Sequence, residues 1–306
     1  MKHRTPDSHP EFAVPAAVFA PARFDRPVTA SRDTAANRRR RRGALALGLF
    51  VAFGLIYYSG DQRRAIPAAV GDSLSGSVRA SRPAGATIRL ATFNIHSGVG
   101  SDHRLNLART AETLQGFDLI LLNEVHGPYF WQPSGQADQL AELTGKRWLF
   151  APTEERWWHH RFGNAVLTSA DVARWQTISL PGHGRTPRNM VLMAVPHGER
   201  TIHVVGTHLD RNDPRDRAEQ VQAAIGLFLS LAEPAVLMGD LNTTAEESCL
   251  EELLRRGDVH DPLGEVLSDK APRRIDWLLT RGLKTVNAGI VDSGASDHPL
   301  IWAELE

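Results

Sequence analysis

Val236-Leu237-Met238-Gly239-Asp240-Leu241-Asn242 is a short apolar run that stops at a glycine and is followed by a carboxylate and a carboxamide. Such a run, which begins two residues after Pro234, predicts a buried strand whose end opens onto a loop. Side chains two residues apart in extended chain point the same way, so Asp240 and Asn242 can both reach one substrate atom or one bound water. An ordinary Asp/Asn turn after a strand is the alternative.

Strand-like runs that end in polar residues recur along the chain. This recurrence favours a shared active site over a set of unrelated turns. The other instances are Asn94 after residues 88–93, Glu124 after 119–122, His208 after 201–207, and the Ser296-Asp297-His298 turn before Pro299.

The charge of the chain is balanced overall but uneven along its length. The 306 residues include 35 basic and 35 acidic side chains. Residues 1–64 hold 12 of the basic and 5 of the acidic ones, so this part has a net charge of +7 and the rest has −7. A negative body offers no bulk attraction for nucleic acid, although it is compatible with a local basic groove. The single cysteine, Cys249, has no partner for an intramolecular disulfide.

The N-terminal part predicts three segments ahead of the folded body. Residues 1–42 are expected to be a disordered basic arm, because residues 1–37 are rich in Pro, Ala and Arg and lack hydrophobic periodicity. Residues 43–58 are uncharged and follow five arginines, which predicts a single transmembrane anchor. A signal peptide and a buried soluble helix are the alternatives. Residues 59–86 are expected to be a flexible linker, since 71–85 are rich in Ser, Gly, Ala and Pro.

The arginines also predict the orientation of the chain. Five of them precede the apolar segment and two, Arg63 and Arg64, follow it. Because positive charge is retained on the cytoplasmic side, the N-terminus is expected in the cytoplasm and the folded body outside it.

Residues 87–306 predict one α/β domain in which strands and helices alternate. Four apolar residues in a row at 119–122 indicate a strand buried on both faces. Apolar residues at helical spacing predict helices over 105–114 and 134–143, after the Asp213-Pro214 cap, and near 246–255. Strands are expected at 88–93, 118–124, 164–169, 175–180, 189–195, 202–207, 236–239, 275–280, 286–290 and 300–303.

Seven motifs in this domain form an ordered series. They are Thr-Phe-Asn94, Asn-Glu124-Val, Gly-Asn164-Ala-Val-Leu-Thr, Gly-Thr-His208-Leu-Asp210, Met-Gly-Asp240-Leu-Asn242, Arg-Ile-Asp276-Trp and Ser-Asp297-His298-Pro. The series resembles the endonuclease/exonuclease/phosphatase superfamily, which has the DNase I-like fold. The resemblance implies a four-layer α-β-β-α sandwich of two mixed β-sheets flanked by helices, and hydrolysis of phosphoric ester bonds. The first motif, an Asn-Ile-His followed by a glycine turn, is also similar to that of proteins tied to lipid and glycolipid-anchor remodelling.

The resemblance implies a metal site made of oxygen ligands. Asn94, Glu124 and Asp297 are the expected ligands, and Mg²⁺ or Mn²⁺ is the expected ion because both accept oxygen donors and water. A surface glutamate in a salt bridge is the alternative for Glu124.

The same resemblance implies the catalytic roles. Asp240 is expected to align or deprotonate the attacking water, and Asn242 to hold a phosphoryl oxygen. His208 is expected to bind phosphate or to protonate the leaving group. Asp276 and His298 are expected to form a dyad in which the carboxylate fixes the tautomer of the histidine and raises its basicity.

Three further features are ambiguous in sequence. His96 stands where many nucleases of the superfamily have an acidic or amide residue. The segment 156–161, Arg-Trp-Trp-His-His-Arg, is compatible with base stacking, with contact to lipid headgroups, or with packing on the body. Arg188 and Asn164 are expected to contact substrate phosphate, with a solvated arginine as the alternative for Arg188.

These features favour a membrane-tethered, Mg²⁺-dependent phosphodiesterase or phosphatase that acts on a lipid headgroup or another small phosphoester. An Mg²⁺-dependent endonuclease or exonuclease that acts on DNA or RNA is the alternative. A catalytically inactive binding module is a third hypothesis, disfavoured because every catalytic motif is present. The sequence leaves the substrate and the oligomeric state open.

Overall fold

The computed structural model describes residues 35–60, 63–77, 87–129, 132–155, 160–183, 186–268 and 272–306. Three sequence predictions lie partly outside these ranges: the disordered arm up to residue 34, the linker at 61–62 and 78–86, and the aromatic segment at 156–159. The chain divides into two units, residues 1–53 and 54–306.

The helix α1 (Ala35–Gly60) contains the five arginines and the apolar run that follows them. The arm expected over residues 1–42 therefore gives way to helix at Ala35. Large apolar side chains of α1 are exposed, among them Phe50 and Tyr57 at 75% and 70%. Among the helices of the described residues, none is both long and apolar enough to cross a membrane. The transmembrane anchor expected over 43–58 is thus not found; its uncharged run is shorter than the roughly 20 residues that span a bilayer core.

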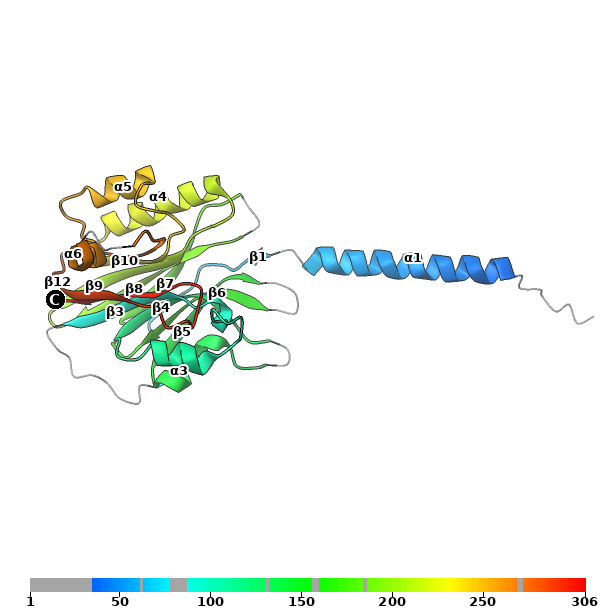
Figure 1. Cartoon of the computed structure of the whole chain (residues 1–306), viewed down its shortest axis with the longest axis horizontal. Coiled ribbons are helices and arrows are strands. Elements are labelled where there is room, and N and C mark those ends of the chain that lie inside the picture. Colours follow the sequence, from blue (N-terminus) through cyan, green and yellow to red (C-terminus); the bar gives the residue numbers. More distant parts are fainter. Residues whose placement is uncertain are drawn as a thin grey trace, which may run out of the picture. The chain divides into compact units, whose positions relative to one another are not determined.

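The second unit contains two β-sheets that pack face to face (Figure 1). The strands are β1 (Arg64–Ala65), β2 (Val70–Gly71), β3 (Ile88–Asn94), β4 (Leu119–His126), β5 (Arg147–Glu155), β6 (Arg161–Thr168), β7 (Arg174–Ser179), β8 (Asn189–His197), β9 (Arg200–His208), β10 (Ala235–Asp240), β11 (Asp276–Arg281), β12 (Thr285–Val291) and β13 (Leu300–Leu305). The first sheet has the order β1-β5-β6-β4-β3-β13-β12, and the second has the order β11-β10-β9-β8-β7-β2. Each is mixed, because β3 and β4 are parallel in the first sheet and β9 and β10 are parallel in the second.

Helices cover the outer face of each sheet. They are α2 (Leu107–Thr113) and α3 (Gln136–Thr144) on the first sheet, and α4 (Pro214–Ser230) and α5 (Ser248–Leu254) on the second. The 3₁₀ turn η1 (His96–Gly98) follows β3, and α6 (Pro262–Leu267) contributes Leu263 to the apolar cluster between the sheets. Buried residues of α2 and α3 pack with the outer face of the first sheet, and those of α4 and α5 with the outer face of the second. A third apolar cluster fills the space between the sheets. The four-layer α-β-β-α sandwich expected from the sequence is therefore confirmed (Figure 1).

Two short strands from the expected linker pair with the edges of the sandwich. β1 pairs with β5 at the edge of the first sheet, and β2 pairs with β7 at the edge of the second. Ser75 then forms a bridge with Trp148. Part of the range expected to be a flexible linker thus belongs to the two sheets.

The sheets approach each other closely near the ends of their parallel strands. Gly206 on β9 faces Leu121 on β4, and a Cβ atom at Gly206 would lie 2.5 Å from Leu121 Cδ1. Beyond Leu121 the pairing of β4 with β6 shifts register between Leu122 and Val125, and Glu124 adopts a φ of 59° there. This bulge turns the Glu124 side chain out of the strand alternation.

Most expected elements lie within a few residues of their predicted positions, but β1, β2, β5 and α6 were not predicted. Pro152 interrupts the β5 sequence and argues against a strand. In the structure the pairing of β5 with β6 shifts between Pro152 and Glu154, so the proline sits at a bulge. The expected cap of α4 is present, since the Asp213 side chain accepts hydrogen bonds from the backbone of the first turn.

Candidate active site

Three adjacent strands of the second sheet deliver three of the expected catalytic residues to one edge. Asp240, the last residue of β10, is the register partner of His208 on β9 and of Asp276 on β11. These side chains are almost fully buried, with exposures of 1%, 4% and 3% for Asp240, His208 and Asp276. The sequence predicted each of them near a strand end, and the strand order places the three side by side.

The first sheet supplies the residues that face them. Asn94, at the end of β3, donates from Nδ2 to Glu124 Oε1 at 3.2 Å and to Asp240 Oδ2 at 3.0 Å. Its Oδ1 atom accepts a hydrogen bond from the backbone N–H of His96. Asn94 was expected to offer an oxygen to a metal ion, whereas here its nitrogen links two carboxylates across the sheets.

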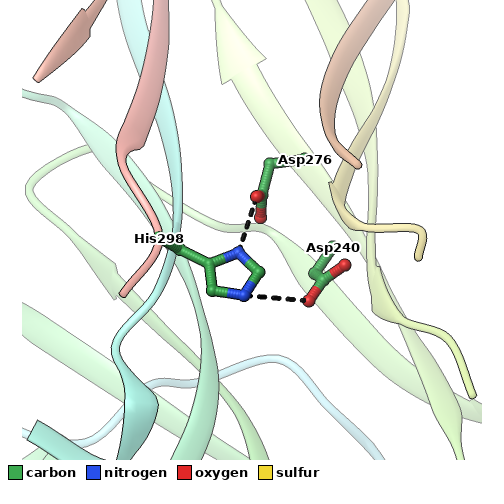
Figure 2. A group of neighbouring side chains, drawn as sticks. All are labelled: Asp240, Asp276 and His298. Carbon is green, nitrogen blue, oxygen red and sulfur yellow. Dashed lines mark hydrogen bonds and ion pairs between the residues drawn. The ribbon is translucent and has the colours of Figure 1, made fainter. Parts of the chain in front are cut away.

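His298, two residues before β13, lies between two carboxylates of the second sheet (Figure 2). Its Nδ1 atom is 2.7 Å from Asp276 Oδ2, and its Nε2 atom is 4.0 Å from Asp240 Oδ2. The expected pairing of Asp276 with His298 is thus present. One ligand atom of each of the three residues lies within 4.8 Å of the others, a spacing compatible with a bound metal ion.

The surroundings of Asp240, Asp276 and His298 raise the pKa values of all three side chains. Burial raises the pKa of Asp240 to about 7, and the neighbouring Asp276 carboxylate adds to the rise. Burial likewise raises the pKa of Asp276, against the effect of its hydrogen bond with His298. Burial opposes the charge on His298, but the Asp276 hydrogen bond and the nearby carboxylates outweigh it and raise the pKa of His298 to about 9. At neutral pH the cluster therefore combines the carboxyl group of Asp240, which is close to half-ionised, with the protonated imidazole of His298.

The surroundings of His208 favour the neutral ring, whereas those of His298 favour the protonated ring. Its Nε2 atom is 3.5 Å from Asp240 Oδ2, and its Nδ1 atom is 3.2 Å from Nη1 of Arg188. Burial lowers the pKa of His208 well below its ordinary value, and the charges of Arg188 and His298 lower it further. The two histidines of the site are thus in different protonation states.

Asn242 and Asp297 lie at the border of the cluster. The backbone N–H of Asn242 donates to Asp240 Oδ1 at 2.9 Å, and its Nδ2 atom donates to the carbonyl oxygen of Leu209. Asp297 is half exposed, and its Oδ1 atom lies 3.4 Å from Nδ1 of His96. The contact of Asn242 with a phosphoryl oxygen and the contact of Asp297 with a metal stay predictions.

A buried network of side-chain amides holds the backbone of Asp240. Asn123 donates to Asn164 Oδ1 at 2.8 Å and accepts the Asp240 backbone N–H at 3.1 Å. Asn164 donates in turn to Asn189 Oδ1 at 3.0 Å. Asn164 was expected to contact substrate phosphate, but it is fully buried and its amide serves this network. Sequence reasoning missed Asn123 and Asn189, although both are adjacent to residues that it singled out.

A group of rings that the sequence did not predict as one unit forms near Glu124. His126 stacks on His160, and Nδ1 of His126 lies 2.7 Å from Nε2 of His160. Nε2 of His126 lies 2.9 Å from Ser97 Oγ. The hydroxyl of Tyr129 lies 2.9 Å from Nδ1 of His126. These rings hold η1 against the end of β4.

Glu124 has the properties of a ligand for a hard divalent cation. Among the described residues, its carboxylate accepts one hydrogen bond, from Asn94, and forms no ion pair with an arginine or a lysine. One oxygen of the neighbouring Asp276 is buried and has no hydrogen-bond partner among the described residues. Excess carboxylate charge with free oxygen lone pairs suits Mg²⁺ or Mn²⁺. The donor set therefore fits a divalent ion.

The two-sheet sandwich with carboxylates and histidines at its strand ends defines a hydrolase of the DNase I-like class. The profile of the endonuclease/exonuclease/phosphatase family matches residues 91–298, and the chain belongs to this family. The family hydrolyses phosphoester bonds, and its enzymes commonly use divalent metals.

Solved structures show the same fold at low sequence identity. A family member from Leptotrichia buccalis C-1013-b aligns at 17% identity and a TM-score of 0.58, over 72% of this chain and 99% of the other. A mannosyl-6-phosphatase from Bacteroides thetaiotaomicron VPI-5482 aligns at 15% identity and a TM-score of 0.56, over 72% and 99%. The human Nocturnin catalytic domain with bound sulfate aligns at 17% identity and a TM-score of 0.56, over 81% and 98%. No curated protein matches the chain in sequence.

Proposed function

We propose that this protein is a metal-dependent phosphoesterase whose reaction centre is Asp240. The observation that supports it best is the position of Asp240 Oδ2, which lies within 4 Å of Asn94, His208 and His298 at the junction of the two sheets. The pKa of about 7 for Asp240 is well placed for a group that takes a proton from water at neutral pH.

The surrounding side chains then stabilise charge, supply a proton and hold Asp240 in position. His298 faces the same space with a protonated ring held by Asp276, so it can stabilise negative charge on a phosphoryl oxygen or protonate a leaving oxygen. Asn242 holds Asp240 through its backbone N–H. The bonds changed are those of ester hydrolysis: a P–O bond forms to water, the P–O bond to the leaving group breaks, and one proton is transferred to the leaving oxygen.

The metal in this proposal is Mg²⁺ or Mn²⁺, held by Glu124 with Asp297 nearby. When bound, such an ion supplies positive charge that polarises a phosphoryl oxygen. Asn94 then acts as a hydrogen-bond link between Glu124 and Asp240.

The substrate we favour is a small phosphoester, in particular a lipid headgroup. The net charge of −7 outside residues 1–64 disfavours a polyanion such as DNA. The mannosyl-6-phosphatase among the solved structures is an example of this fold in a phosphatase. A nuclease is the alternative that the same site chemistry allows.

We further propose that α1 associates with a membrane and that the catalytic domain lies outside the cytoplasm. The exposed apolar side chains of α1 next to five arginines support this arrangement. Alkaline phosphatase fused after Glu306 should then be active in cells. An inactive fusion that is expressed in full would contradict the orientation.

Parallel assays test the substrate. The full-length protein with Mg²⁺ is given a vesicle-embedded phospholipid, a soluble sugar phosphate, bis-p-nitrophenyl phosphate and plasmid DNA. A matched fragment of residues 61–306 keeps β1 and β2 but lacks α1. The proposal predicts that both proteins hydrolyse the soluble esters equally and that the full-length protein is faster on the vesicle lipid. Plasmid nicking at moderate salt, without lipid hydrolysis, would favour the nuclease.

A further inference from the structure

The contact between Arg188 and His208 determines where the proton of His208 is. Nη1 of Arg188 lies 3.2 Å from Nδ1 of His208. A guanidinium group carries only N–H donors and has no acceptor. Nδ1 of His208 must therefore be the acceptor in this hydrogen bond, and the proton of the neutral ring is on Nε2.

The surroundings of Arg188 show that it belongs to the interior of the domain. Arg188 immediately precedes β8 and is 9% exposed, and its Nε atom is buried without a hydrogen-bond partner in the described residues. Burial lowers the pKa of Arg188, and the carboxylates of Asp210, Glu154, Asp240 and Glu124 oppose this effect and favour its charged form. The guanidinium in this position donates to an internal partner, and the contact with substrate phosphate expected from the sequence stays a prediction.

We infer that Arg188 is a positioning residue: it holds His208 in the tautomer that presents an N–H from Nε2 to the reaction centre. The tautomer follows from the geometry alone, whereas the catalytic consequence rests on the proposed phosphoester hydrolysis.

The Nε2 proton of His208 has room for a further acceptor. It faces Asp240 Oδ2 at 3.5 Å, which is longer than an ordinary N–H···O hydrogen bond, and that oxygen already accepts from Asn94 at 3.0 Å. A phosphoryl oxygen of the substrate can therefore take this proton as a hydrogen bond.

The same tautomer excludes His208 as the general acid. If a neutral imidazole gave up its Nε2 proton, it would become an imidazolate, a strong base that does not accumulate at neutral pH. A second proton on Nδ1 would remove the acceptor for Arg188. The proton for the leaving oxygen must therefore come from His298 or from water, and His208 acts as a neutral hydrogen-bond donor.

Nitrogen NMR of the full-length chain labelled with ¹⁵N-histidine measures this directly. The spectrum of His208→Gln identifies the His208 signals among the 13 histidines. We expect one protonated nitrogen, Nε2, and one unprotonated nitrogen, Nδ1, in the wild type at neutral pH. In Arg188→Met we expect loss of this single-tautomer pattern, and in Arg188→Lys, which keeps a cationic donor, we expect its partial return.

Kinetics with Mg²⁺ and bis-p-nitrophenyl phosphate test the catalytic consequence. Arg188→Met should lower kcat about tenfold or more, the scale of losing a hydrogen bond to a charged group, and change KM by less than about threefold. Arg89→Met is the matched control, since Arg89 also has a buried, unpartnered Nε but contacts Phe117 and Trp302 instead.

Two results would overturn the inference. The first is a His208 ring in the wild type that carries its proton on Nδ1 or on both nitrogens. The second is an Arg188→Met protein with unchanged His208 signals and a raised KM, which would make Arg188 a substrate contact. Both NMR readouts are independent of turnover, so absence of any phosphoester hydrolysis would refute the proposed function without deciding the tautomer. If Arg188→Met does not fold, the wild-type spectrum and Arg188→Lys still decide the question.

Discussion

Nδ1 of His298 lies 2.7 Å from Oδ2 of Asp276, and the two residues belong to opposite sheets of the sandwich. Asp276 begins β11 in the second sheet, and His298 comes just before β13 in the first. The pair therefore forms only when the two sheets are docked. Because the two residues do not pair in the unfolded chain, their interaction stabilises the folded state in which the sheets are docked.

The pKa shift of His298 predicts how stability depends on pH. The folded pKa of about 9 lies above the ordinary value of 6.5, so the folded state holds the proton more tightly. The resulting stabilisation is fully present below about pH 6.5 and is lost as the pH rises through about 9. In EDTA, we expect the wild type to lose about 2 kcal/mol relative to His298→Gln between pH 6 and pH 10, a value discounted for partial solvent exposure.

Urea unfolding of both proteins across this pH range measures the difference. His103→Asn, a change at an exposed histidine, serves as the control and should follow the wild type. A wild type that gains stability relative to His298→Gln as the pH rises would show that the sign of the shift is wrong.

Gly239 is predicted to be irreplaceable because of its backbone. It has a φ of 137°, and a Cβ atom there would lie 1.9 Å from the carbonyl oxygen of Thr207. We expect Gly239→Ala to reduce the free energy of unfolding by about 3 kcal/mol or more. A Cβ atom at Gly226 in α4 would have no neighbouring atom within 4 Å, so Gly226→Ala should increase the free energy of unfolding by about 0.5 to 1 kcal/mol. Equal effects of the two substitutions in thermal or urea unfolding would contradict this account of the β10 end.

Removal of metal should abolish the reaction. We expect activity to disappear in EDTA and to return with Mg²⁺ or Mn²⁺, because the available donors are oxygens. Glu124→Gln should need at least about tenfold more Mg²⁺ for half-maximal activity, since it loses a charged ligand. Glu112→Gln, at an exposed position on α2, is the control. Full wild-type activity in EDTA would disprove the metal site.

The sequence was sufficient for the fold and for much of the cluster. The apolar runs that end at Asn94, His208 and Asp240 predict strands with polar ends. Parallel pairing places the ends of β9 and β10 together, and the packing of the two sheets brings Asn94 to Asp240. Strand β5 was missed because Pro152 breaks its pattern, and only the pairing with β6 shows that a bulge accommodates it.

The directions in which side chains point could not be predicted from the sequence. Asn164 and Arg188 were both expected to contact substrate phosphate. Whether such an amide or guanidinium faces substrate or an internal partner depends on the register of β6 and β8 against their neighbours. In the structure Asn164 faces Asn123 and Arg188 faces His208. The role of Asn123 was missed for the same reason: it is part of the Asn-Glu124-Val motif, but the motif does not show that its side chain faces Asn164 and the Asp240 backbone.

The turnover of Asp240→Asn tests the proposed centre most directly. The full-length wild type, Asp240→Asn and His298→Ala are assayed with Mg²⁺ on bis-p-nitrophenyl phosphate, and circular dichroism verifies that each is folded. We predict hydrolysis by the wild type and a loss of at least about a hundredfold in each variant, the scale of removing a positioned acid or base. Turnover of Asp240→Asn within about threefold of the wild type would contradict the assignment of Asp240 as the reaction centre.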